Sequence, residues 1–108
     1  MEQLQIKEKN GANYVLLELS GSLNSYNIGE FQTKVYENIQ KRTMVLDLSQ
    51  LASIDSTGVG VIMAGFNDGE EYGHKFYLMN PSPVARLALE ETGFYEIFNF
   101  IHSVTEVD

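Results

Sequence analysis

Alternating and continuous runs of apolar residues predict two strands at the start of the chain. Residues 4–9 begin with the apolar and polar alternation of a half-buried strand, and residues 14–19 form an almost unbroken apolar run. Asn10-Gly11 stands between them and is a strong turn signal. The two segments therefore predict an opening hairpin, which we expect to end at Gly21.

An amphipathic helix is expected after this hairpin. Residues 21–25 form a loop rich in capping side chains, so the helix should begin near Asn24 or Ser25. Its predicted apolar stripe consists of Ile28, Phe31, Val35 and Ile39. The largely apolar run at residues 43–48 then predicts a strand in the centre of a sheet.

A second helix is predicted over residues 57–68, directly after the dipeptide Asp55-Ser56. Its predicted core face consists of Val59, Ile62, Met63 and Phe66. The polar segment 68–74 contains two glycines, so the helix should end within it. Residues 75–80 predict a further strand.

A third helix is expected to start at Ser82, with Ser82 as its N-cap and Pro83 at its first helical position. Its predicted apolar stripe consists of Val84, Leu87 and Ala88, and Gly93 is the expected C-terminal stop. Residues 94–101 predict a last short strand, and Ser103 to Glu106 have the pattern of a capping box.

The resulting order of elements is β-β-α-β-α-β-α-β. Helices that alternate with apolar strands imply crossover connections and parallel pairing. We therefore expect an α/β fold with a mainly parallel mixed sheet of about five strands, an antiparallel hairpin at the N-terminus, and one domain over residues 1–108.

The second helix has a second face that lacks long charged side chains. It consists of Thr57, Gly60, Val61, Ala64 and Asp68. The helix also contains Gly58, Gly60 and Gly65, and a glycine in a helix interior costs about 1 kcal/mol against alanine. Breaches of local preference often mark functional sites, so we predict that this face is a docking surface. The competing interpretation is that a neighbouring helix covers it within the fold.

Ser56 lies where the backbone N–H groups at the start of this helix are unpaired. Three roles are compatible with that position: an N-cap, a phosphoacceptor and a nucleophile. The catalytic role is the weakest, because neither His74 nor His102 has the context of a Ser-His-acid arrangement and the local sequence is not a Gly-x-Ser-x-Gly elbow. A phosphate, in contrast, would meet helix N–H groups and would place about two negative charges beside Asp55.

Charge and composition narrow the possible partners. The net charge is −8, and residues 43–108 contain two basic residues against ten acidic ones. This balance opposes nucleic-acid binding and fits a protein partner with a basic surface, although acidic excess also simply aids solubility. The chain has no cysteine and only two histidines far apart in sequence, so no metal site is predicted. Gly58-Val59-Gly60 lacks the ending of a phosphate loop, so no nucleotide cofactor is predicted either.

The location of the protein is predicted from its N-terminus and its apolar runs. The first residues lack the order of a signal peptide, and the longest run without polar side chains, residues 58–66, is too short to span a bilayer. We therefore expect a cytoplasmic protein without membrane insertion.

The segment from Asp55 to Val61, Asp-Ser-Thr-Gly-Val-Gly-Val, follows an apolar strand that ends Leu46-Asp47-Leu48. In this motif, in length and in element order the chain resembles the anti-sigma factor antagonists, which are bacterial STAS-domain proteins. The loop at residues 21–24 and the region around Thr92-Gly93-Phe94 and Ile97 match as well. The resemblance covers essentially the whole chain.

The resemblance implies a partner-switching regulator rather than an enzyme. The unphosphorylated antagonist would bind an anti-sigma factor that is also a serine kinase and thereby release the sigma factor. The kinase, using its own ATP, would phosphorylate Ser56 and separate the complex, and a phosphatase would restore the antagonist. Here Ser22 and Asn24 replace the two acids that the family commonly has in its early loop.

The docking hypothesis and the resemblance together give a set of predicted partner-binding residues: Asn24, Asp55, Ser56, Thr57, Gly58, Val59, Gly60, Val61 and Ala64. Two other functions stay open on the sequence. The chain could be a STAS scaffold or regulatory subunit of a transporter or sensory complex, without sigma-factor control. It could also be a phosphocarrier that uses His74, although a lone histidine in a polar loop is usually just solvated.

Overall fold

The first two strands form the predicted antiparallel hairpin. The structure, a computed structural model, describes residues 3–107; in it β1 (Gln5–Asn10) pairs with β2 (Tyr14–Leu23). β2 does not end at Gly21 as predicted but continues through it. Gly21 has φ +89°, and a Cβ atom there would strike the backbone carbonyl of Gln3. Only glycine lets the strand run on through this close approach.

The remaining strands join the hairpin in chain order. β3 (Thr43–Ile54), β4 (Phe76–Met79) and β5 (Asn99–Ile101) each pair in parallel with the strand before, so the five-stranded sheet has the order β1-β2-β3-β4-β5. β3 is central, as predicted. β5 is shorter than the strand predicted for residues 94–101, because a 3₁₀ turn occupies Tyr95–Ile97.

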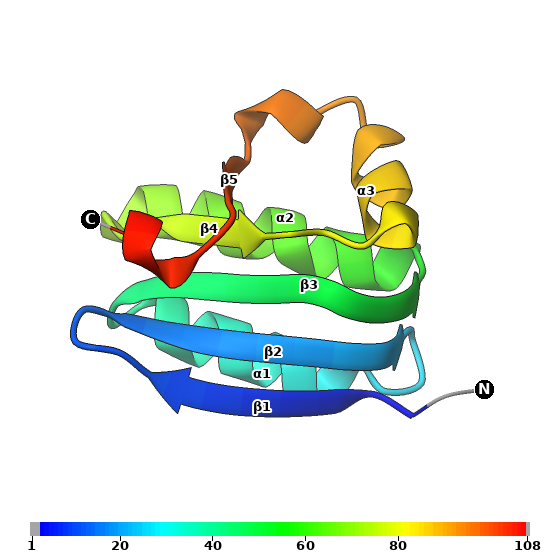
Figure 1. Cartoon of the computed structure of the whole chain (residues 1–108), viewed down its shortest axis with the longest axis horizontal. Helices are drawn as coiled ribbons and strands as arrows, with labels where there is room; N and C mark the ends of the chain where they lie inside the picture. The colour runs from blue at the N-terminus through cyan, green and yellow to red at the C-terminus, as the bar shows by residue number, and fades with distance from the viewer. Residues whose placement is uncertain (1–2, 108) are drawn as a thin grey trace.

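The order of the strands decides where the helices lie. Right-handed crossovers that always step to the next strand in one direction place their helices on the same face of the sheet. Figure 1 shows α1 (Ile28–Ile39) and α2 (Ser56–Tyr72) side by side behind the sheet, with α3 (Pro83–Glu90) at one end of the molecule. None of the helices within residues 3–107 is long and apolar enough to cross a membrane.

Two glycines let α2 approach its neighbours closely. A Cβ atom on Gly65 would lie 2.8 Å from a methyl carbon of Val35 and 2.8 Å from the ring of Phe76. One turn later, a Cβ on Gly69 would lie 3.3 Å from Ile39. Val35 and Ile39 are four residues apart on α1, as Gly65 and Gly69 are on α2, so the two helices run parallel and in register. α2 ends within the predicted segment, at Gly73, which has φ +75°.

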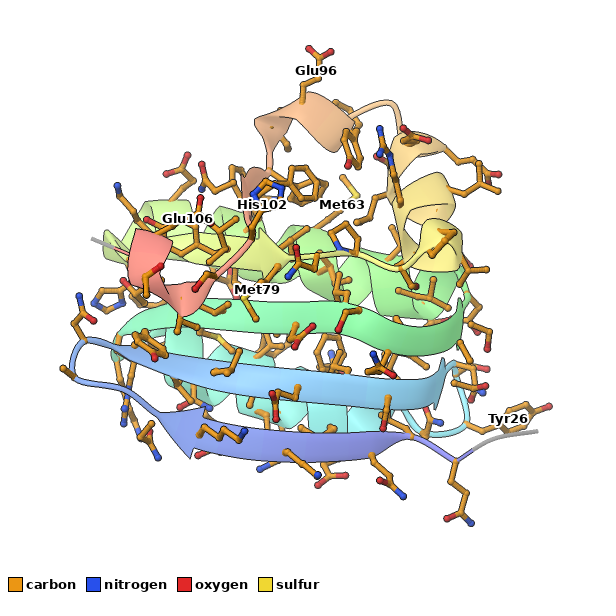
Figure 2. The ribbon with its side chains drawn as sticks, viewed as in Figure 1. Tyr26, Met63, Met79, Glu96, His102 and Glu106 are labelled. Carbon is orange, nitrogen blue, oxygen red and sulfur yellow. The ribbon has the colours of Figure 1, made fainter. Side chains whose placement is uncertain are left out.

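The opposite face of the sheet has its own small apolar layer. Its buried members are Leu16, Val45, Tyr77, Met79 and Ile101. The C-terminal segment lies over this layer with Val104 and Val107, as Figure 2 shows around Met79 and Glu106. The predicted capping box at Ser103 to Glu106 is present and shapes that segment.

The predicted apolar stripe of α3 is wrong. Ser82 is the N-cap and Pro83 the first helical residue, as expected, but Ala85 and Leu89 are the buried residues. Ser82 donates its backbone N–H to the carbonyl oxygen of Leu48 and its hydroxyl to that of Leu51, both in β3. These two bonds fix the rotation of the helix on the sheet. They leave the predicted stripe, Val84, Leu87 and Ala88, outside the core.

Candidate functional site

Asp55, and not Ser56, caps the start of α2. Asp55 has extended backbone angles, and its Oδ1 accepts the backbone N–H of Gly58 at 3.1 Å. Ser56 is therefore the first residue of the helix, and of the three roles considered for it the N-cap does not hold. Its side chain is exposed and makes no hydrogen bond within residues 3–107. The helix thus presents a free hydroxyl at its positive end.

The same carboxylate ties the loop before α1 to the start of α2. Oδ2 of Asp55 accepts the backbone N–H of Ser25 at 3.1 Å, and the backbone N–H of Asp55 donates to the carbonyl oxygen of Leu23 at 3.1 Å. Two strands that neighbour each other in the sheet end here, so their loops meet. The site is built at the carboxyl ends of the parallel strands, where ligands of open α/β sheets are usually bound.

Asn24 lies in this site as a turn residue. Its Oδ1 accepts the backbone N–H of Tyr26 at 2.9 Å, and its own backbone N–H donates to Oδ1 of Asn27 at 3.0 Å. Asparagine side chains often form such turns in competition with helix formation. This turn is why α1 starts at Ile28 and not near Asn24 or Ser25, as the sequence predicted.

The predicted docking face of α2 is only partly at the surface. Thr57 and Gly60 are exposed, and Ala64 is half-buried. Val61 is 6% exposed and belongs to the main core, so its prediction as a docking residue is wrong. The parallel register with α1 that pairs Val35 with Gly65 puts Phe31 at the level of Val61. The competing interpretation, cover by a neighbouring helix, therefore holds for Val61.

Two more of the predicted partner-binding residues are buried. Gly58 packs against Ile54 and Leu23, and a Cβ atom on it would lie 2.8 Å from Ile54. Val59 is buried as well, as its place on the predicted core face requires. Of that predicted core face Ile62 is fully buried, whereas Met63 and Phe66 are half-buried.

A groove of about 270 Å³ begins at Ser56 and runs between α2 and α3. Its walls consist of Ile54, Asp55, Ser56, Val59, Ala88, Glu91 and Thr92. Two of these residues are acidic and none is basic. Leu87 lies one helical turn before Glu91 on the outside of α3 and is 56% exposed, so the apolar surface continues from the groove onto that helix. The sequence pattern does not reveal the α3 side of this groove, because it places Ala88 in the predicted core stripe of that helix.

The two histidines are engaged elsewhere. Nδ1 of His74 lies 2.6 Å from the carbonyl oxygen of Ile39, to which it donates a hydrogen bond at the end of α1. His102 lies beside Glu106, with 3.9 Å between Nδ1 and the nearest carboxylate oxygen. Neither histidine contacts Ser56, and no group of three potential metal ligands occurs among the described residues. Neither histidine is therefore placed to act as a general base for Ser56.

The chain is similar to known proteins in both sequence and fold. The family model of the STAS domain matches residues 3–107. A Paenibacillus polymyxa protein named anti-sigma F factor antagonist is 26% identical and aligns over 97% of this chain and 96% of its own length.

Two of the solved structures that match are similar over nearly the whole fold. A Thermotoga maritima protein, a candidate anti-sigma factor antagonist, superposes with a TM-score of 0.83 at 26% identity and covers 94% of this chain and 89% of its own. The Bacillus cell fate determinant SpoIIAA in its phosphorylated form gives a TM-score of 0.74 at 22% identity, with 98% and 97% coverage.

Proposed function

This chain belongs to the STAS domain family, and from that premise we propose that it is an anti-sigma factor antagonist controlled by phosphorylation of Ser56. In this proposal the unphosphorylated form binds an anti-sigma factor that is also a serine kinase, and the sigma factor is released. The kinase then phosphorylates Ser56 with its own ATP, which separates the complex, and a phosphatase restores the antagonist. The chain itself acts by binding and catalyses no reaction.

The observation that carries the proposal is the free hydroxyl of Ser56 at the start of α2. The cap of the helix is made by Asp55, so the fold does not use the Ser56 hydroxyl. A phosphate there would lie against helix N–H groups, which favour anions. The folded chain can therefore carry a phosphate at this position without loss of a native hydrogen bond.

The surroundings of Ser56 support a switch that acts through charge. The groove beside it carries Asp55 and Glu91 and no basic side chain. A phosphate would add close to two negative charges to this acidic, partly apolar surface. Among the described residues, no basic side chain of the groove would compensate these charges. A bound kinase would also hold the negatively charged phosphates of its nucleotide opposite the same atom. Both effects weaken the complex after phosphoryl transfer.

The test is phosphorylation of the purified chain by purified anti-sigma factor kinases of its host, each supplied with ATP. We expect one phosphate per chain by intact-protein mass, located on Ser56 by fragmentation. Ser56→Ala should receive none, whereas Thr57→Ala, which removes the adjacent exposed hydroxyl, should be phosphorylated normally. Ser56→Ala should stay bound to the kinase, and Ser56→Asp should bind poorly.

Two results would contradict the proposal in different ways. Equal kinase binding by Ser56→Asp and the unmodified chain would remove the charge mechanism. Stable binding of a host protein without phosphorylation would point to the scaffold function in a transporter or sensory complex.

A further inference from the structure

Tyr26 is the most exposed large apolar side chain within residues 3–107. It is 93% exposed, whereas the next, Leu87, is 56% exposed. Figure 2 shows Tyr26 pointing into solvent at the end of the molecule where β2 and β3 finish. The core makes no use of its ring, and removing the ring leaves no cavity behind. The fold therefore gives no reason for an aromatic residue at this position.

The loop that carries Tyr26 is held in one conformation. The backbone N–H of Tyr26 donates to Asn24, and the side-chain amide of Asn27 donates to the carbonyl oxygen of Ser22 at 2.8 Å. The backbone N–H of Ser25, directly before Tyr26, donates to Asp55 at 3.1 Å. A loop fixed by its own hydrogen bonds presents a side chain with little further loss of entropy on binding.

The position of Tyr26 links it to the phosphoacceptor. Tyr26 follows Ser25 and Ser56 follows Asp55, so both residues directly adjoin the hydrogen bond between the backbone N–H of Ser25 and the carboxylate of Asp55. Both are exposed at the same end of the sheet. A protein that brings its catalytic centre to Ser56 must therefore come within reach of Tyr26.

We propose that Tyr26 anchors the kinase that phosphorylates Ser56, by inserting its ring into an apolar recess on that kinase. This inference rests on the proposed function and names a residue of the partner interface. The loop around Tyr26, residues 22–27, has no charged side chain, whereas Asp55 and Glu91 on its other side are acidic. The partner surface that fits is an apolar recess with a hydrogen-bond acceptor for the phenol, next to basic residues that face the two carboxylates. Tyrosine is enriched among the few residues that dominate binding energy at interfaces.

The experiment measures the Kd between the chain and the kinase that phosphorylates Ser56 in the assay above. Three variants are compared: Tyr26→Ala, Tyr26→Phe and Tyr72→Ala. Tyr72 is the matched control, because it is 48% exposed and lies at the other end of α2. We expect Tyr26→Ala to raise Kd by about tenfold or more. Tyr26→Phe should keep most of the affinity, since it retains the ring, and Tyr72→Ala should bind like the parent.

Thermal unfolding separates a binding effect from a folding effect. Because the Tyr26 side chain is almost fully exposed, its variants should unfold within a degree or so of the parent. An unchanged Kd for Tyr26→Ala, with the parent bound, would overturn the anchor and leave the proposed function standing. If the parent chain itself neither binds nor is phosphorylated by any of the kinases, both the anchor and the proposed function fall.

Discussion

Two glycines of α2 should respond in opposite directions to the same substitution. Gly60 and Gly65 both lie in the interior of the helix. Gly60 is exposed, and a Cβ atom added to it meets nothing within 4 Å. A Cβ added to Gly65 would be wedged between Val35 on α1 and Phe76 on β4, at 2.8 Å from each. The pair therefore isolates packing from helix propensity.

The magnitudes follow from two terms. Replacing glycine by alanine in an exposed helix interior stabilises it by about 0.5–1 kcal/mol. Gly65→Ala gains the same amount but introduces an overpacked contact, which costs about 1–3 kcal/mol. Val35 and Phe76 are both fully buried on different elements, so one cannot give way without pressing on the core around it. We expect Gly60→Ala to be more stable than the parent and Gly65→Ala to be less stable by about 1–2 kcal/mol.

Urea unfolding, followed by far-ultraviolet circular dichroism, measures both changes. The midpoints should move in opposite directions at equal slope, and thermal midpoints should move by about 4–8 °C per kcal/mol for a chain of this size. If Gly65→Ala is stabilised as much as Gly60→Ala, α2 does not lie as close to α1 and β4 as described. Gly60 also lies on the proposed partner surface, so its alanine variant should bind the kinase less well although it is more stable.

Three further predictions concern the same end of the molecule. Val61→Lys should lower the free energy of unfolding by several kcal/mol, because it buries an unpaired charge in the core, whereas Asn67→Lys on the exposed side of α2 should unfold like the parent. Equal unfolding midpoints for the two variants would mean that Val61 lies at the surface. Asp55→Ala should lower the free energy of unfolding, measured in urea, by about 1–2 kcal/mol, and Asp55→Asn should lower it less, since asparagine keeps one of the two acceptor oxygens. If Asp55→Ala is as stable as the parent, the cap and the bond to Ser25 do not stabilise the fold. Leu87→Lys should have a free energy of unfolding within about 0.5 kcal/mol of the parent's, whereas Leu89→Lys should prevent stable folding. The reverse order of effects would mean that the apolar stripe predicted from the sequence is the buried one.

The order of the elements could be predicted because its signals are local. The Asn10-Gly11 turn, the Ser82-Pro83 helix start and the capping box at Ser103 all act within a few residues. Whether a segment forms a strand or a helix is indicated by the spacing of its apolar residues, which is also a short-range signal. The α/β fold with five strands and an opening hairpin therefore agrees with the sequence prediction, and so does its STAS assignment.

The rotation of the helices could not be predicted in the same way. The apolar residues of α3 occupy two overlapping sets of positions, so either set could face the core. The hydrogen bonds from Ser82 to β3 are tertiary contacts, and they orient the helix so that Ala85 and Leu89 are buried. α2 is apolar around most of its circumference, so no polar face marks the side that meets solvent. Likewise Asp55 and Ser56 are both capping residues in sequence. The tertiary structure shows why Asp55 is the cap: its carboxylate accepts the N–H of Gly58 with one oxygen and the N–H of Ser25, thirty residues earlier, with the other.

Close packing explains three of the glycines in α2 but not the fourth. At Gly58, Gly65 and Gly69 a Cβ atom would come within 3 Å of a neighbour, which for Gly69 is the backbone carbonyl oxygen of His74 at 2.6 Å, so close packing explains these glycines. Gly60 has no such neighbour and weakens the helix without any packing gain. It lies one turn from Ser56, whose hydroxyl the fold leaves unused. Because helix propensity favours alanine at this position and packing does not oppose it, the fold gives no reason for glycine at residue 60, and the proposed partner surface beside Ser56 supplies one.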